Sequence, residues 1–275
     1  MTANNNAAVP ADAAVASIVA KYKELVSPLA NTVIGAITSQ LVNTRADGAC
    51  NMPAGSLIAD SQLAATQPAA LGGAVLAFMN GGGVRAPGFN FASSAAGEGD
   101  GNITYGEAFA VQPFGNSLTT ITMSTQLIRD FLEEQFAGCG GQPAATTRFA
   151  LPSAGFKYTW NGANACGTRI TNATLRTATG AEALITNGVV QNPTKTYRVT
   201  VNNFMAEGGD GYATLTRGTN RIGGAQDIDA LSAFLAGFRA PNAYNLAAVA
   251  LDGGTPRINR MGTSSVCPGG TNTNP

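Results

Sequence analysis

Three short stretches combine a turn with an aromatic or charged side chain, and these are where the chain could do chemistry. The first, NNFMAEGGDGYATL at residues 202–215, places Phe204 just after an alternating strand pattern and Asp210 just after two glycines. Gly208 and Gly209 permit a sharp turn, so the carboxylate can return toward the ring. A ring beside a carboxylate offers a face for a flat base and an acceptor for two hydroxyls. A turn in which the Asp only bonds its own backbone is the alternative.

The second stretch, VQPFGN at residues 111–116, sets Phe114 between a proline and a glycine. Little helix or strand surrounds this ring to bury it, so it can act as an aromatic plate for a flat ligand, with the amide of Asn116 beside it. The alternative is a loop phenylalanine whose ring fills part of the core.

The third stretch, FMNGGGVR at residues 78–85, ends a strand in three glycines and places Arg85 two residues later. Glycines expose backbone N–H groups, and a planar guanidinium matches phosphate oxygens. A flexible turn with a surface arginine is the alternative. The stretch is not a Walker loop, because no Gly-Lys-Ser/Thr follows, and it lacks the helix start of the dinucleotide-binding fingerprint.

Composition narrows the possible functions. The 275 residues hold 16 Lys and Arg against 16 Asp and Glu, so no basic field exists to hold nucleic acid or an anionic membrane. No apolar run reaches transmembrane length, and the first residues lack the regions of a signal peptide. With 12% charged residues and abundant Gly, Ala, Thr and Asn, the balance favours an exported protein, periplasmic or secreted, whose sequence here begins after the signal.

The histidine and cysteine content of the chain excludes or disfavours several kinds of catalytic and metal site. The chain has no histidine, so a Ser-His-Asp triad, a His-ligated metal and an imidazole base are excluded within it. The four cysteines form no CxxC pair, which argues against a zinc or thioredoxin-type site and favours disulfides. A Cys139–Cys166 bridge between two Gly-flanked loops is sterically feasible, with Cys50–Cys267 as its complement. Four cysteines allow three pairings, and the sequence does not choose among them.

Apolar periodicity predicts the elements that must position these stretches. We expect a helix capped by Asp12 that buries one stripe of residues 15–29, and strands across residues 147–201. We expect residues 86–102 to form a surface loop. The remaining expected elements are helices at 55–65, 104–110 and 125–136 (stopped by Gly138), a strand at 74–79, a helix opened by Asp227 or Asp229, and a frayed tail from Gly262.

Seven stretches, in order, resemble the C-terminal domain of the 5'-nucleotidase family, which includes UDP-sugar hydrolases, 2',3'-cyclic nucleotide phosphodiesterases and ecto-nucleotidases. They are GSLIADSQLAAT, NGGGVR, ITYGEAFAVQPFGN, FLEEQF, SAGFKYTW, YRVTVNNFMAEGGDGY and DIDALSAFL, within a region from Val15 to Phe238. The resemblance implies an α/β fold with mixed sheets in a four-layer α/β/β/α arrangement. It also implies an N-terminal metallophosphatase domain that holds two divalent metal ions.

Carried onto this chain, the resemblance implies a nucleotide site. Phe114 and Phe204 would sandwich the base, and Asp210 would accept the two ribose hydroxyls. Asn116 would meet a base edge.

The glycine-rich motif would complete this site. Asn80 would lie near the nucleoside, with Gly82 and Gly83 beside it, and Arg85 would bind phosphate. Arg45 is the nearest candidate for a second phosphate arginine, although TRADGACNMPAGSLIAD departs from the family's usual acidic approach to this helix.

These inferences give an interdomain linker helix region at residues 1–30, a substrate-binding domain at 31–260 and a flexible tail at 261–275. We expect a nucleotide- or nucleoside-binding domain of a metal-dependent phosphohydrolase, inactive by itself, whose partner is the metallophosphatase domain of the same protein. No cofactor is expected in this chain. The alternative is a stand-alone nucleotide- or nucleoside-binding module without catalysis.

Overall fold

A computed structural model describes residues 12–44, 48–94, 97–248, 256–262 and 267. The helices are α1 (Ala13–Ala30), α2 (Pro53–Thr66), α3 (Tyr105–Val111), α4 (Thr125–Glu133), α5 (Asn203–Ala206) and α6 (Asp227–Leu235), with 3-10 turns η1 (Ala69–Leu71), η2 (Gly81–Gly83), η3 (Gly209–Gly211) and η4 (Ala213–Arg217). The strands are β1 (Val33–Ala36), β2 (Leu41–Val42), β3 (Leu76–Asn80), β4 (Gly88–Phe89), β5 (Asn102–Thr104), β6 (Ser117–Ser124), β7 (Ala150–Pro152), β8 (Phe156–Trp160), β9 (Ile170–Thr177), β10 (Gly180–Thr186), β11 (Val189–Val190), β12 (Thr196–Asn202), β13 (Thr219–Gln226) and β14 (Ile258–Arg260).

The central sheet has the strand order β13-β6-β12-β3-β7. β12 and β3 are parallel, whereas β6 is antiparallel to β12 and β7 is antiparallel to β3. The ends of β3 and β12 therefore meet the starts of β6 and β7 at one edge of the sheet. Register brings Asn202 opposite Leu118 and Asn80 opposite Ala150. Four segments that are distant in the chain thus enter or leave the sheet side by side.

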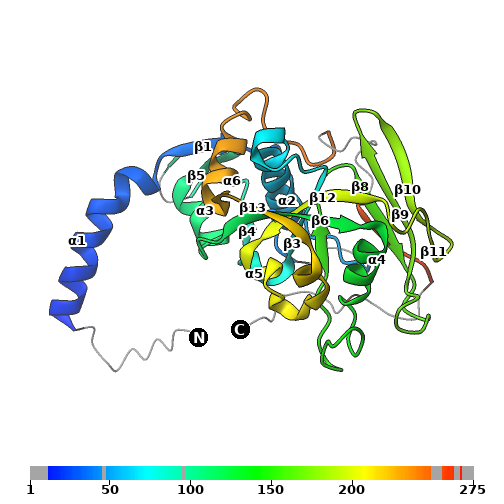
Figure 1. The fold of residues 1–275 in the computed structure, drawn as a ribbon. Helices are drawn as coiled ribbons and strands as arrows, with labels where there is room; N and C mark the ends of the chain where they lie inside the picture. Colours follow the sequence, from blue (N-terminus) through cyan, green and yellow to red (C-terminus); the bar gives the residue numbers. More distant parts are fainter. Residues whose placement is uncertain (1–11, 45–47, 95–96, 249–255, 263–266, 268–275) are drawn as a thin grey trace.

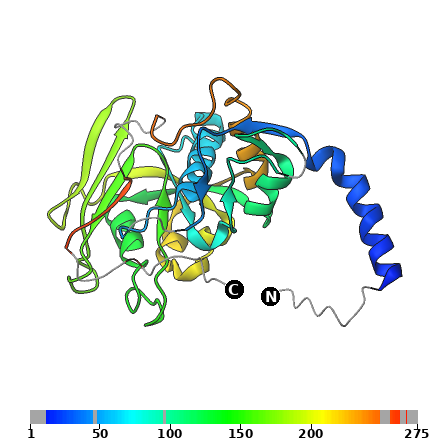
Figure 2. The ribbon, with the colours of Figure 1, turned by 180° about the vertical axis from the view of Figure 1, so that it is seen from behind.

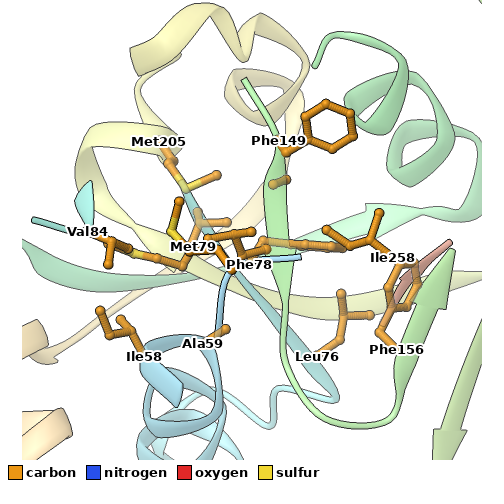
Figure 3. Packing of buried hydrophobic residues seen from close by; sticks show 14 of the residues in the cluster. Ile58, Ala59, Leu76, Phe78, Met79, Val84, Phe149, Phe156, Met205 and Ile258 are labelled. Carbon is orange, nitrogen blue, oxygen red and sulfur yellow. The ribbon is translucent and has the colours of Figure 1, made fainter. Parts of the chain in front are cut away.

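The second five-stranded sheet, β11-β10-β9-β8-β14, packs against the central sheet. Phe78 of β3 makes edge-to-face contacts with Phe156 of β8 and Phe131 of α4, at ring-centroid distances of 5.2 and 5.1 Å. Successive strand residues point to opposite faces, and Met79 accordingly faces α2, where Gln62 donates to its sulfur. Figure 3 shows this packing around β3. The two mixed sheets and the helices confirm the expected α/β class.

Helix α1 corrects one expectation. Asp12 caps the helix as expected, accepting from the N–H of Val15. However, no residue of α1 is buried, and the apolar stripe is exposed at Val15, Ile18, Val19, Tyr22, Leu25, Val26 and Leu29. Figures 1 and 2 show why: α1 extends away from the body and meets it only at its C-terminal end. The stripe predicted the helix correctly, but its burial needs a partner surface that the described residues do not provide.

Two smaller expectations are also wrong. Gly88 and Phe89 are buried and form β4, which pairs with β2, so residues 86–102 are not entirely a surface loop. Helix α4 ends at Glu133 rather than at Phe136, so Glu134 and Gln135 lie beyond the helix, where their side chains accept from the N–H groups of Thr214 and Ala150.

Both cysteine pairs form disulfides. Cys139 is bonded to Cys166 and Cys50 to Cys267, so the structure selects one of the three pairings that the sequence left open. The Cys267 bond fixes one point of the region expected to be a flexible tail; most other residues of that tail lie outside the described residues. Among the described helices, none combines the length and apolar character needed to cross a membrane.

Candidate functional site

A pocket of about 160 Å³ lies at the sheet edge where the four segments converge. Its walls come from the turn after β3, the loop before β6 and the segment after β12. The residues that line it are Asn80, Gly82, Gly83, Arg85, Phe114, Asn116, Phe204 and Asp210. These are all of the predicted site residues except Arg45, which lies outside the described residues. The structure therefore brings the three sequence stretches together in one place, while their binding roles remain predictions.

Phe204 is held at the pocket by its short helix and by a glycine. Asn202 caps α5 by accepting from the N–H of Met205 at 2.8 Å. A Cβ at Gly209 would lie 2.6 Å from the Phe204 ring and from its carbonyl oxygen, so this ring packs directly on the glycine backbone. The ring is nevertheless 44% exposed. Local sequence thus fixes where the ring stands without burying it.

Phe114 faces the same pocket and is 45% exposed, so it does not serve as a core plug. The guanidinium carbon of Arg85 lies 4.6 Å from its ring centroid, a cation–π contact. Arg85 is also held through its backbone, whose N–H donates to the carbonyl of Val111. The cation and the ring therefore form one wall that can meet both a base and an anionic group.

Asp210 is fixed by donors on both carboxylate oxygens. Asn80 donates to Oδ2 at 2.7 Å, and Arg148 donates to Oδ1 at 2.6 Å. Asn80 in turn accepts from the buried amide of Asn202 at 2.9 Å. Asp210 has φ of 58°, a left-handed conformation that Asp tolerates better than most residues. The alternative of an Asp that only caps its own turn is wrong, because its oxygens bond to residues far away in the chain.

Asn116 lies between the pocket and a buried carboxylate. Its carbonyl accepts from the N–H of Asp227, the first residue of α6, at 2.8 Å. Burial raises the pKa of Asp227 above its ordinary value, while the N–H of Ile228 and the side chain of Asn116 oppose that shift. This buried group anchors the loop that carries Phe114 and Asn116.

Gly82 and Gly83 form the floor of the pocket in the η2 turn. A Cβ at Gly83 would meet the terminal methyl of Met79 and would lie 3.0 Å from Oδ1 of Asn80, so a side chain there would require these two side chains to shift. Glycine at this position leaves Met79 and Asn80 undisturbed.

Two residues of the site were missed by sequence reasoning. Arg148 bonds the carboxylate of Asp210, and Gln142 donates to the Asp210 carbonyl at 2.6 Å. Both lie in a polar loop between α4 and β7. No local pattern marks them, since only the pairing of β7 with β3 carries Arg148 to this edge.

The site offers no metal centre of its own. The chain has no histidine, and the described residues contain no cluster of three His, Cys, Asp or Glu that could hold a metal ion. The resemblance places its two divalent metal ions in a separate N-terminal domain, and that expectation stays a prediction. What the pocket presents is aromatic faces, one carboxylate, two amides and one guanidinium.

Known proteins are similar to this chain in sequence and in fold. Residues 33–217 match the family model described as 5'-nucleotidase, C-terminal domain. The chain is 34% identical over 166 residues to the trifunctional nucleotide phosphoesterase protein YfkN of Bacillus subtilis, covering 60% of this chain and 10% of the relative. It is 32% identical over 213 residues to the NAD 5'-nucleotidase of Haemophilus influenzae, covering 74% of this chain and 32% of the relative.

A solved structure extends the comparison. The 5'-nucleotidase precursor from Thermus thermophilus is 28% identical, with a TM-score of 0.68 over 93% of this chain and 45% of that one. The chain thus spans less than half the length of each of these three proteins. The matched region includes every described residue that lines the pocket. This chain belongs to the 5'-nucleotidase C-terminal domain family.

Proposed function

We propose that this chain is the nucleotide-binding part of a metal-dependent phosphohydrolase, in which it holds the nucleoside while phosphate is removed elsewhere in the same protein. The base stacks between Phe114 and Phe204, and Asp210 accepts the two ribose hydroxyls. Arg85 faces the phosphate, and Asn116 meets a base edge. The names of the relatives support a nucleotide as the ligand.

The observation that carries the proposal is the shared exposure of two phenylalanines in one pocket. An exposed aromatic side chain forgoes the free energy of burial. Here two rings, 90 residues apart in the chain, are both nearly half exposed beside one oriented carboxylate. That combination matches the chemistry of a nucleoside, which has one flat apolar base and one polar sugar.

The free energies expected from these contacts are those of a binding site. Stacking contributes about 1–3 kcal/mol per base, and a hydrogen bond to a charged group contributes about 1.5–3 kcal/mol. After the costs of ordering the ligand are subtracted, such contacts support binding near the micromolar range, since about 8 kcal/mol corresponds to 1 μM. Binding and orientation, rather than bond breaking, are what these residues supply.

Reaction chemistry is assigned to the metallophosphatase domain that the family pairs with this one. We assign no metal ligand to the described residues, which contain no cluster of three His, Cys, Asp or Glu. Its part is to place the nucleotide at a fixed distance and angle from the reacting centre. We further propose a periplasmic or secreted location, because both cysteine pairs form disulfides and these persist in oxidising compartments.

Calorimetry with the 275-residue chain tests the proposal. Adenosine, guanosine, cytidine and uridine are titrated first, followed by the monophosphate of the tightest binder. Phe204→Ala is expected to weaken binding of that nucleoside by at least about tenfold, because one stacking face is lost. Phe109→Ala is the matched control, since Phe109 is 45% exposed but does not line the pocket.

If none of the four nucleosides binds the unmodified chain, the proposed function is wrong. If the Phe204 and Phe109 variants lose affinity equally, Phe204 is not part of the binding surface.

A further inference from the structure

The backbone around Asp210 does not hold this carboxylate in place by itself. Asp210 lies in a single 3-10 turn, between Gly208 at φ of 88° and Gly211 at φ of 80°. It has positive φ itself, and no strand or long helix includes it. A segment built this way has little intrinsic preference for one conformation. Contacts from elsewhere must therefore determine where the carboxylate points.

Those contacts come largely from the loop between α4 and β7. Gln142 donates to the Asp210 carbonyl at 2.6 Å, and a Cβ on Gly211 would lie 2.6 Å from the same amide. The Arg148 carbonyl accepts from the hydroxyl of Tyr212 at 2.5 Å. The loop thus contacts Asp210 and the two residues that follow it.

The Arg148 side chain completes the grip by bonding the carboxylate. Its NH1 donates to Oδ1 at 2.6 Å, and the Asp210 side chain is only 7% exposed. Arg148 is itself positioned by its N–H, which donates to the carbonyl of Gln135 at 2.8 Å. Each carboxylate oxygen can accept more than one hydrogen bond. Arg148 and Asn80 therefore leave both oxygens able to accept from hydroxyls.

We propose that Arg148 is a positioning residue that makes the site selective for ribose. It does so by holding the Asp210 carboxylate in the orientation that accepts the 2'- and 3'-hydroxyls. This inference rests on the proposed function, because it assigns the sugar recognition of the same pocket. Arg148 does not line the pocket, so it acts through Asp210 rather than on the ligand.

The test compares a nucleoside with its analogue that lacks both hydroxyls. The tightest of the four nucleosides and its 2',3'-dideoxy counterpart are titrated into the unmodified chain and into Arg148→Gln. The unmodified chain is expected to prefer the ribonucleoside by about tenfold or more, because two hydrogen bonds to a carboxylate are at stake. In Arg148→Gln that preference is expected to fall to about threefold or less, with affinity for the dideoxy analogue almost unchanged.

Three further variants distinguish a positioning role of Arg148 from a role in folding. Arg148→Lys retains the charge but not the guanidinium geometry, and an intermediate preference is expected. Gln142→Ala removes the other support and should reduce the preference in the same direction. Arg176→Gln, at an exposed position on β9, controls for loss of one positive charge. Thermal unfolding of each variant verifies that it is folded.

The outcomes are distinct. If no nucleoside binds the unmodified chain, the proposed function itself fails. If the unmodified chain prefers the ribonucleoside and Arg148→Gln keeps that preference, the positioning role is wrong while the proposed function stands. Equal losses for the nucleoside and its dideoxy analogue would mean that Arg148 supports only the fold. A loss confined to the nucleoside monophosphate would mean that Arg148 contacts phosphate.

Discussion

Gly209 shows how a single residue controls the pocket. Its backbone lies against the ring and the carbonyl of Phe204, and it directly precedes Asp210. The residue has no positive φ that would by itself demand glycine. Space alone excludes a side chain here, and the same space sets the distance between the ring and the carboxylate.

Replacement of Gly209 by alanine tests this control. The new Cβ would lie 2.6 Å from ring atoms and from a backbone oxygen, so the Phe204 ring must move. We expect Gly209→Ala to weaken nucleoside binding at least about fivefold, measured by calorimetry. Gly223→Ala is the control, because a Cβ at Gly223 would have no atom within 4 Å. Unchanged affinity in Gly209→Ala would show that the position of the ring does not matter for binding.

At the scale of elements, the end of α4 connects several segments that are far apart in the chain. Glu133 accepts from the N–H groups of Gly167 and Ile170, and Glu134 accepts from the N–H and hydroxyl of Thr214. Gln135 accepts from the N–H of Ala150 at the start of β7. Three consecutive residues thus join the start of β9, the η4 turn that follows Asp210, and the start of β7. Burial raises the pKa of both glutamates above the ordinary value of 4.5.

The raised pKa of Glu134 predicts a pH dependence. Burial is the main cause; the hydrogen bonds from Thr214 and the charge of Arg217 oppose it, and Asp130 adds to it. When the pKa of a carboxyl is higher in the folded state than in the unfolded state, the group stabilises the fold at pH values below its unfolded-state pKa. This contribution is lost as the pH rises through the folded-state pKa. We therefore compare the free energy of unfolding of the unmodified chain with that of Glu134→Gln. The unmodified value minus the variant value should be larger at about pH 4 than at about pH 7.

Urea unfolding at the two pH values measures this difference. Glu207→Gln, at an exposed residue, controls for removing one carboxylate from the molecule. A difference that increases with pH would mean that the fold favours the ionised form of Glu134.

At the scale of the whole molecule, a buried ion pair joins segments from opposite ends of the chain. Arg257 makes two hydrogen bonds to Asp60 of α2, at 2.7 and 2.8 Å, and also donates to the carbonyl of Pro152 in β7. Tyr244 donates its hydroxyl to the same carboxylate at 2.8 Å, and burial raises its pKa well above the ordinary value. This cluster fastens the C-terminal segment to α2 and β7.

Arg257→Met is expected to lower the free energy of unfolding by about 3–5 kcal/mol, because it leaves the buried Asp60 carboxylate without its cation. Guanidinium unfolding measures the loss. The double variant Arg257→Met with Asp60→Leu should be less destabilised than the single variant, since no buried charge is then left unpaired. A double variant that loses the sum of the two single losses would show that the two side chains act independently.

Part of the site could be predicted from the sequence because its signals are local. Phe204 and Asp210 stand within seven residues of one another, separated by glycines that dictate a turn, and Phe114 is isolated between proline and glycine. Arg148 has no such signal, because its partner lies 62 positions away and meets it only through the order of the strands. The short strands β4 and β14 were missed for a related reason: each pairs with a partner distant in sequence.

By itself, the sequence determined which segments turn and which chemistry is excluded, since these depend on residue type and near neighbours. Only the tertiary structure decided that the ends of β3 and β12 and the starts of β6 and β7 share one edge. It also left the apolar stripe of α1 exposed. The physical reason is the same in both cases: periodicity reveals that a face is apolar, but only the packing of distant segments determines what that face meets.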